Sequence, residues 1–108
     1  MIIERVHGRT REEAKKKINN FLEELMRQAF PGGVKIKDAE KRWNGNRMNF
    51  SFKVKKGIVG TKICGSINIT DDSVTLNSDL PGMVTTFVSE EKIKEVINRE
   101  FDDLFQMA

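Results

Sequence analysis

The stretch that decides the fold spans residues 47–80 and has the sequence RMNFSFKVKKGIVGTKICGSINITDDSVTLNSDL. Apolar and polar residues alternate in three successive runs, and a period of two is typical of half-buried β-strands. Residues 57–60 and 71–73 interrupt the alternation with residue types that favour turns. The stretch therefore predicts three consecutive strands with tight connections, and each strand has one apolar and one polar face.

The alternation also assigns a face to each residue of these strands. Because successive side chains of a strand point to opposite sides of a sheet, every second residue should face the core. The residues expected on the apolar face are Met48, Phe50, Phe52 and Val54 in the first strand, Ile63, Gly65, Ile67 and Ile69 in the second, and Val74, Leu76 and Leu80 in the third.

A strand and an amphipathic helix are predicted before these strands. Residues 2–6 are apolar and β-branched and favour a short strand. Residues 10–13 form a capping box, in which the Thr10 hydroxyl accepts from the Glu13 amide and the Glu13 side chain reaches back. Apolar residues then recur at spacings of three and four until the break at residues 31–33, which predicts one helix with the stripe Ala14, Ile18, Phe21, Leu22, Leu25, Met26 and Ala29.

A second helix is predicted at the end of the sequence. Residues 80–88 form an apolar connection without a clear period, and Ser89 after them is a suitable N-cap. Val88 and Ile93 are placed to form a hydrophobic staple across the first helical turn. The apolar stripe of this helix is Ile93, Val96, Ile97, Phe101, Leu104 and Phe105.

Residues 34–46 supply one more strand. Residues 34–37 alternate apolar and basic, the pattern loosens over residues 38–43, and Asn44-Gly45-Asn46 is a hairpin turn signal. The predicted order is therefore β-α-β-β-β-β-α. The most economical arrangement is one α+β domain over residues 1–108, with two layers: an antiparallel sheet of four to five strands and two helices packed on one face.

The composition limits the classes of protein to consider. A chain of 108 residues suits one domain with one core. Its first residues become charged too early for a signal peptide, and no apolar run approaches the roughly 18 residues of a membrane span. The single cysteine, Cys64, cannot form an intrachain disulfide, so we expect a cytoplasmic protein.

The charge is unevenly distributed along the chain. Residues 34–69 carry nine basic and two acidic side chains, whereas residues 70–108 carry three basic and nine acidic. This distribution indicates a solvated face, on which lysines discourage edge-to-edge association of sheets, or a face for an anionic partner. With Arg42, Arg47 and Lys56 near its ends, the predicted basic sheet face consists of Lys35, Lys37, Lys53, Lys55 and Lys62.

Several strings in the sequence resemble a known family. They are residues 3–7 with the charged helix start at residues 12–14, the segment 57–76 that joins the predicted strands, and the helical segment 93–101. In these strings the chain resembles the bacterial polyhydroxyalkanoic acid system family, also described as a granule-region family. The resemblance implies a cytoplasmic accessory protein linked to storage-polymer metabolism, and it implies no catalytic residues.

Three features that often carry chemistry have plainer interpretations here. His7 is the only histidine and has no evident orienting partner, so a structural role or solvent exposure is favoured over catalysis. Cys64 falls on a polar face without a nearby base, which predicts a semi-exposed, unreactive thiol. The glycines of residues 57–60 precede a strand and not a helix, so they indicate a tight connection in place of a phosphate loop. We expect no catalytic residue, no metal site and no cofactor.

The sequence therefore favours a binding protein over an enzyme. Met83, Val84 and Phe87 in the apolar connection would either close the core or form an exposed apolar patch. Such a patch would contact a granule surface, a lipid or a protein partner, and the basic face would add electrostatic attraction to an anionic surface.

Other hypotheses remain open. A nucleic-acid binder would use the lysines, with Trp43 as the one possible stacking residue. Homodimerisation would use an exposed first or last strand of the sheet. A carrier of a small apolar molecule would hold it between the sheet and the last helix, in a cavity lined by residues such as Phe50, Phe52, Ile67, Leu76 and Phe101.

Overall fold

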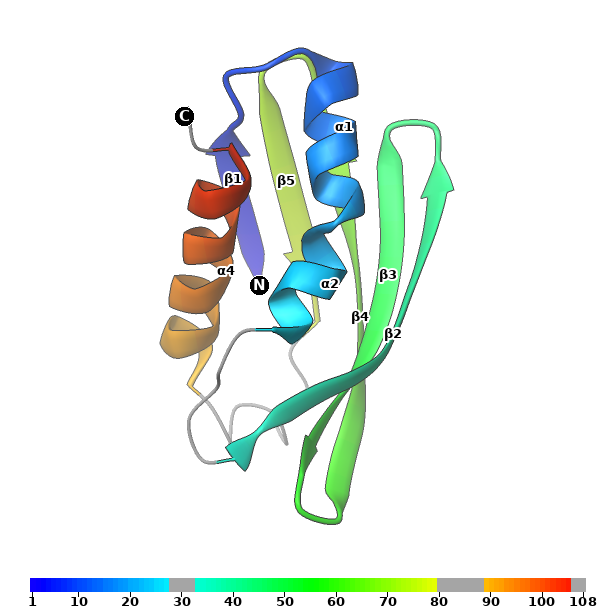
Figure 1. Cartoon of the computed structure of the whole chain (residues 1–108), viewed down its shortest axis with the longest axis vertical. Coiled ribbons are helices and arrows are strands. Elements are labelled where there is room, and N and C mark those ends of the chain that lie inside the picture. Colours follow the sequence, from blue (N-terminus) through cyan, green and yellow to red (C-terminus); the bar gives the residue numbers. More distant parts are fainter. Residues whose placement is uncertain (28–32, 80–88, 106–108) are drawn as a thin grey trace.

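The computed structural model describes residues 1–27, 33–79 and 89–105 (Figure 1). The strands and helices follow one another in the predicted order, except that the first helix is divided in two. They are β1 (Ile2–Val6), α1 (Arg11–Asn19), α2 (Phe21–Met26), β2 (Lys35–Asn44), β3 (Arg47–Lys56), β4 (Val59–Ile69), β5 (Ser73–Ser78) and α4 (Glu90–Phe105).

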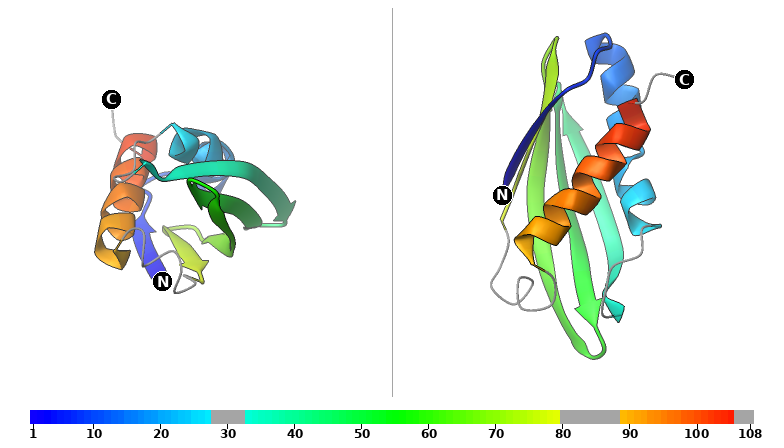
Figure 2. Two further views of the ribbon diagram at one scale, coloured as in Figure 1. Left: turned by 90° about the horizontal axis from the view of Figure 1, so that it is seen from below. Right: turned by 90° about the vertical axis from the view of Figure 1, so that its left-hand side faces the viewer.

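The strands form one five-stranded antiparallel sheet with the order β1-β5-β4-β3-β2. The strands β2 to β5 pair as consecutive neighbours, and β1 pairs with β5 at the far edge. The helices cover one face of this sheet, with α4 lying across it on the side of β1 (Figure 2). The predicted α+β architecture is therefore confirmed.

Strand alternation places the core as expected. Every apolar residue assigned to the inner face of β3 is buried, and so are Ile63, Ile67 and Ile69 of β4 and Val74 and Leu76 of β5. Leu80 lies outside the described residues. The helices contribute apolar side chains that complete this core: Ala14, Ile18, Phe21, Leu22, Leu25, Ile93, Val96, Ile97 and Phe101.

The prediction of one continuous helix after β1 was wrong, because the helix breaks at Asn20. This residue has φ −97° and ψ 1°, outside the α-helical range. Asparagine is a poor helix former, and two asparagines stand together here. The neighbouring Asn19 also accepts bonds from β2 side chains, so a tertiary contact fixes the chain where the helix ends. Met26, expected in the apolar stripe, is exposed.

The caps of the helices follow the sequence signals. The Thr10 hydroxyl accepts from the Glu13 amide at 3.1 Å and also bonds the Glu13 carboxylate at 3.3 Å. Ser89 accepts from the Lys92 amide at 3.2 Å, as an N-cap does. The predicted staple partner Val88 lies outside the described residues.

Two hairpins of the sheet have matching turns. Gly45-Asn46 joins β2 to β3, and Gly57-Ile58 joins β3 to β4, because Asn44 pairs with Arg47 and Lys56 pairs with Val59. The first turn residue is a glycine with positive φ in both, 63° at Gly45 and 62° at Gly57. Glycine adopts this backbone conformation without steric cost, so the predicted tight connection at residues 57–60 is confirmed.

The strand β2 contains an irregularity where the alternation in its sequence loosens. The pairing with β3 shifts between Lys37 and Glu40, and Asp38 has a φ of 53°. A bulge inserts an extra residue and reverses which residues face each side of the sheet. After the bulge, Glu40 and Arg42 share the outer face with Lys35 and Lys37.

Candidate functional site

The register of the strands brings the five predicted lysines onto the outer face of the sheet, away from the helices. Lys37 pairs with Lys53, and Lys53 pairs with Lys62, so these residues form a row across three strands. Lys35 pairs with Lys55 in a second row beside it. We call these five residues the lysine face, and their predicted placement on one surface is correct.

The lysine face is unfavourable for the sheet itself. Like charges directly opposite each other on neighbouring strands destabilise the pairing. One acidic residue offsets part of this repulsion, because Asp38 in the bulge forms an ion pair with Lys53 at 3.6 Å. Both side chains are more than half exposed, so this ion pair contributes little. The row of lysines therefore places like charges opposite each other with little compensation from this ion pair.

Two shallow hollows lie between the side chains of this face. One has a volume of about 410 Å³ and the other of about 720 Å³, and Glu40, Ser51 and Lys62 border both. Lys53 also lines the first hollow, and Arg42 and Cys64 line the second. An anionic group would meet ammonium groups here, with hydroxyl and carboxylate groups between them.

Trp43, the one possible stacking residue, is not part of the lysine face. Its indole Nε1 donates to Asn19 Oδ1 at 2.9 Å, and the Lys15 ammonium lies 5.0 Å from the ring centroid. Lys41 also faces the helices, where it bonds the Asn19 carbonyl and Glu23. The bulge in β2 turned both residues inward, so the described part of this face carries no aromatic stacking residue.

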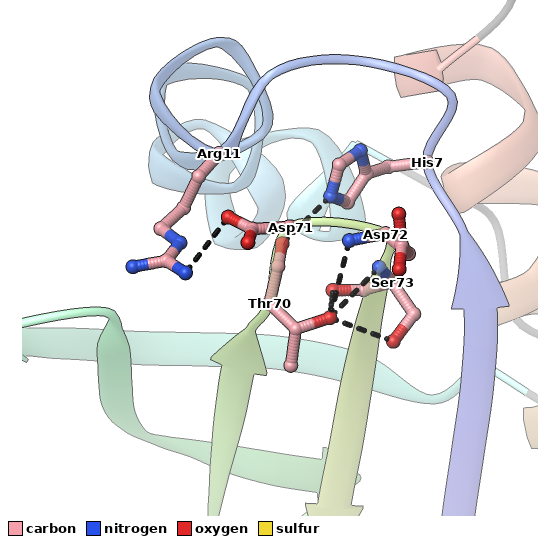
Figure 3. A network of polar contacts seen from close by, with 6 residues as sticks. All are labelled: His7, Arg11, Thr70, Asp71, Asp72 and Ser73. Carbon is pink, nitrogen blue, oxygen red and sulfur yellow. Dashed lines mark hydrogen bonds and ion pairs between the residues drawn. The ribbon is translucent and has the colours of Figure 1, made fainter.

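His7 has a structural role, in agreement with the favoured interpretation. The residue is 3% exposed and lies where β1 ends, beside the turn that joins β4 to β5 (Figure 3). Its Nδ1 accepts from the Arg9 amide at 3.0 Å, which leaves Nε2 to donate to the Thr70 carbonyl at 2.9 Å. Both ring nitrogens are therefore used in holding the backbone.

The turn that His7 contacts is itself closed by local bonds. The Thr70 hydroxyl accepts from the amides of Asp72 and Ser73, at 3.3 and 3.0 Å (Figure 3). Arg11 at the start of α1 forms an ion pair with Asp71 at 2.7 Å. These contacts join the β1–α1 connection to the β4–β5 turn.

Cys64 is exposed on the outer face of β4, opposite Ser51, as its parity predicted. Among the described residues, no group of three or more His, Cys, Asp or Glu residues is placed to hold a metal ion. This face offers ammonium groups for electrostatic binding and the Ser51 hydroxyl for hydrogen bonding.

The comparison with family models gives a match over residues 1–105, to the family described as "Putative polyhydroxyalkanoic acid system protein". The chain belongs to this family. The match extends from β1 to the last turn of α4, so it includes the whole described sheet and the resemblance seen in the sequence is confirmed.

Comparisons with curated proteins and with solved structures gave no match. None of the helices described for this family member is both long and apolar enough to cross a bilayer.

An apolar cavity does lie between the sheet and the helices of this polyhydroxyalkanoic acid system protein. Phe50, Phe52 and Leu76 line it as the carrier hypothesis required, but Ile67 and Phe101 do not. Its volume is about 40 Å³. Pockets for small molecules have volumes of roughly 300 Å³ or more, so the described structure does not offer a carrier site.

The predicted apolar patch of Met83, Val84 and Phe87 lies outside the described residues. The structure shows a different exposed apolar site that the sequence interpretation missed, at Ile58 and Val59 in the β3–β4 hairpin. The glycines of residues 57–60 were correctly assigned to a tight connection. The sequence did contain a sign of this exposed site. The β-branched residues Ile58 and Val59 lie between the glycines, and a tight turn does not require them.

Proposed function

We propose that this family member is a non-catalytic accessory protein of the polyhydroxyalkanoate system, which binds an anionic surface of the storage granule through the lysine face. The observation that carries the proposal is the row of Lys37, Lys53 and Lys62 across three paired strands. This arrangement costs folding free energy, and an anionic partner would offset the repulsion.

The location of the lysines suits a partner that is broad and flat. The lysine face is on the opposite side of the sheet from the helices, so a large surface can approach it without meeting them (Figure 2). Nearby lysines contribute roughly 1 kcal/mol each to binding at an anionic membrane surface, and salt screens this attraction. Three lysines in one row would change an affinity at least tenfold.

Cytoplasmic location is part of this proposal, because the granules and the reducing conditions that keep the Cys64 thiol free are both found there. Met83, Val84 and Phe87 remain proposed apolar contacts of the same granule. A nucleic-acid partner is less favoured, because Trp43 is held by Asn19 on the helix side of the sheet.

The proposal is tested by co-sedimentation of the purified protein with isolated polymer granules at several salt concentrations. The variant Lys37→Gln/Lys53→Gln/Lys62→Gln should bind at least tenfold more weakly at low salt. A control, Lys16→Gln/Lys17→Gln/Lys94→Gln, removes the same charge from α1 and α4 and should bind like the original protein. Equal binding of both triple variants would contradict the proposal, as would binding that does not weaken with salt.

A further inference from the structure

The hairpin between β3 and β4 ends in an exposed apolar tip. Ile58 is 100% exposed and Val59 is 42% exposed, and neither belongs to the hydrophobic core formed by the described residues. The tip lies beyond the ends of the helices, at the bottom of Figure 1, and it projects in the same way in the second view of Figure 2. We define the apolar tip as Ile58 and Val59.

The geometry of the β3–β4 turn does not require an isoleucine at position 58. The other hairpin turn, Gly45-Asn46, also begins with a glycine at positive φ and has an asparagine in its second position. Polar residues such as Asn, Asp and Ser are the usual occupants of that position after glycine. The protein therefore contains a polar version of the same turn at the opposite end of β3, and Ile58 is the exception.

Lysines lie near the apolar tip on both strands of its hairpin. Lys53, Lys55 and Lys56 precede the turn in β3, and Lys62 follows it in β4. At about 3.3 Å per residue, Lys53 is roughly 13 Å from the turn along the strand. The Lys55 stem lies over Gly60, where an added Cβ would be 3.1 Å from Lys55 Cγ. Such a stem supports the ammonium group beside an apolar surface.

An apolar tip with lysines on both adjoining strands is complementary to an anionic lipid surface, which has negative headgroups above an apolar layer. A protein partner would need an interface of roughly 1,000 Å² or more, and two side chains at a hairpin tip supply far less. A lipid surface needs no matching shape, because the headgroups rearrange around the inserted side chains.

We propose that the apolar tip inserts into an anionic lipid surface while the nearby lysines contact the headgroups. The inference deepens the proposed function, on which it rests, by naming anionic lipid as the surface that the lysine face meets. Each lysine near the headgroups contributes roughly a fivefold gain in affinity, and the apolar tip supplies the part of the binding that salt does not remove.

Insertion is measured with an environment-sensitive fluorophore attached to one cysteine. In the background Cys64→Ser, one variant carries Val59→Cys beside the intact Ile58, and a control carries Asn46→Cys in the polar turn. Vesicles of phosphatidylcholine with phosphatidylglycerol should shift the emission of the label at position 59 to the blue and leave the label at position 46 unchanged. Vesicles of phosphatidylcholine alone should change neither.

The matched substitution is Ile58→Asn, which copies the sequence Gly-Asn of the other turn. The variant should keep the melting temperature of the original protein. It should weaken binding to the anionic vesicles at least fivefold and abolish the shift at position 59. Absence of a shift at position 59 on vesicles that bind the protein would overturn the insertion. Unchanged vesicle binding by Ile58→Asn would do the same, even if the lysine variant loses granule binding and so supports the proposed function.

Two further outcomes separate the inference from the function it rests on. Granule binding without any binding to anionic vesicles would overturn lipid insertion and leave the proposed function standing. Insertion into vesicles without granule binding would support the lipid contact of the tip and contradict the granule as its site.

Discussion

The imidazole of His7 donates from Nε2 to the carbonyl oxygen of Thr70, at 2.9 Å, and so joins two residues that are 63 positions apart in the chain. The same ring accepts from the Arg9 amide through Nδ1. The His7 amide also donates to the Asp72 carbonyl at 3.1 Å. The short edge strand β1 is therefore fixed to the turn between β4 and β5 through both the backbone and the side chain of one residue.

Replacing His7 with alanine should destabilise the protein by about 1–3 kcal/mol, because two partly buried hydrogen bonds are lost and the buried ring leaves a cavity. The free energy of unfolding in urea measures the effect. Val6→Ala is the matched control, since Val6 is the preceding residue and is exposed on the outer face. An unchanged urea midpoint for the His7 variant would show that the contact has no structural role.

Gly65 should tolerate no side chain. A Cβ added there would be 2.7 Å from both the Asn77 carbonyl oxygen and Phe50 Cζ, and the carbonyl belongs to the backbone of the paired strand β5. Overpacking of this kind costs about 1–3 kcal/mol, so Gly65→Ala should lower the melting temperature clearly.

The control for that substitution is Gly60→Ala in the same strand. The nearest atom to its added Cβ is Lys55 Cγ, at 3.1 Å, and a flexible lysine can move away. Alanine also reduces the conformational freedom of the unfolded chain. Gly60→Ala should therefore be close to neutral, and equal losses of stability for the two alanine variants would contradict the distinction drawn between these glycines.

Glu23 should give a small contribution to stability that disappears in acid. Burial by itself would raise the pKa of Glu23, but the hydrogen bond from Lys41, the backbone amide of Glu23 and the charges of Lys41 and Arg27 together lower the pKa below the ordinary value of 4.5. A lowered folded-state pKa stabilises the fold above the unfolded-state pKa, and the gain is lost as the pH falls through the folded-state pKa.

Glu23→Gln should accordingly reduce the free energy of unfolding near neutral pH by at most about 0.5 kcal/mol, because the Glu23 side chain is 53% exposed and solvent screens the pair. The two proteins should converge as the pH is lowered from about 7 to about 3. Urea midpoints across this range test the prediction, and a difference that grows toward acid would have the wrong sign.

The parity of side chains along a strand predicted more of this molecule than helix periodicity did. The core of β3 to β5 and the lysines on the opposite face follow from alternation alone. Strict alternation from Lys35 and Lys37 would put Trp43 on the lysine side, but the bulge near Asp38 shifts the count by one residue and puts it on the helix side. A bulge depends on the partner strand, and the sequence of one strand does not specify it.

The break of the first helix and the exposed tip have a similar explanation. Asn19 ends α1 where Lys41 and Trp43 of a distant strand bond it, and this contact exists only in the folded chain. Ile58 lies between two glycines, and the sequence does not say which residues of that segment pair. Only the pairing of Lys56 with Val59 leaves Ile58 in the turn and exposed.

The lysine face should show a conflict between stability and binding that a single substitution can detect. Lys62 is paired with Lys53, which is paired with Lys37, so Lys62 experiences repulsion along the row. Threonine favours strands and removes that repulsion. Lys62→Thr should therefore raise the free energy of unfolding by roughly 0.2–1 kcal/mol.

The electrostatic part of this gain is recognised by its response to salt. The Debye length falls from about 10 Å at 0.1 M salt to about 3 Å at 1 M, so the advantage of Lys62→Thr should shrink in concentrated sodium chloride. The same variant should bind granules more weakly at low salt. Greater stability with reduced binding would show that Lys62 is retained at a cost to the fold, whereas a loss of stability that salt does not change would show that the lysine stem packs on the sheet and stabilises it.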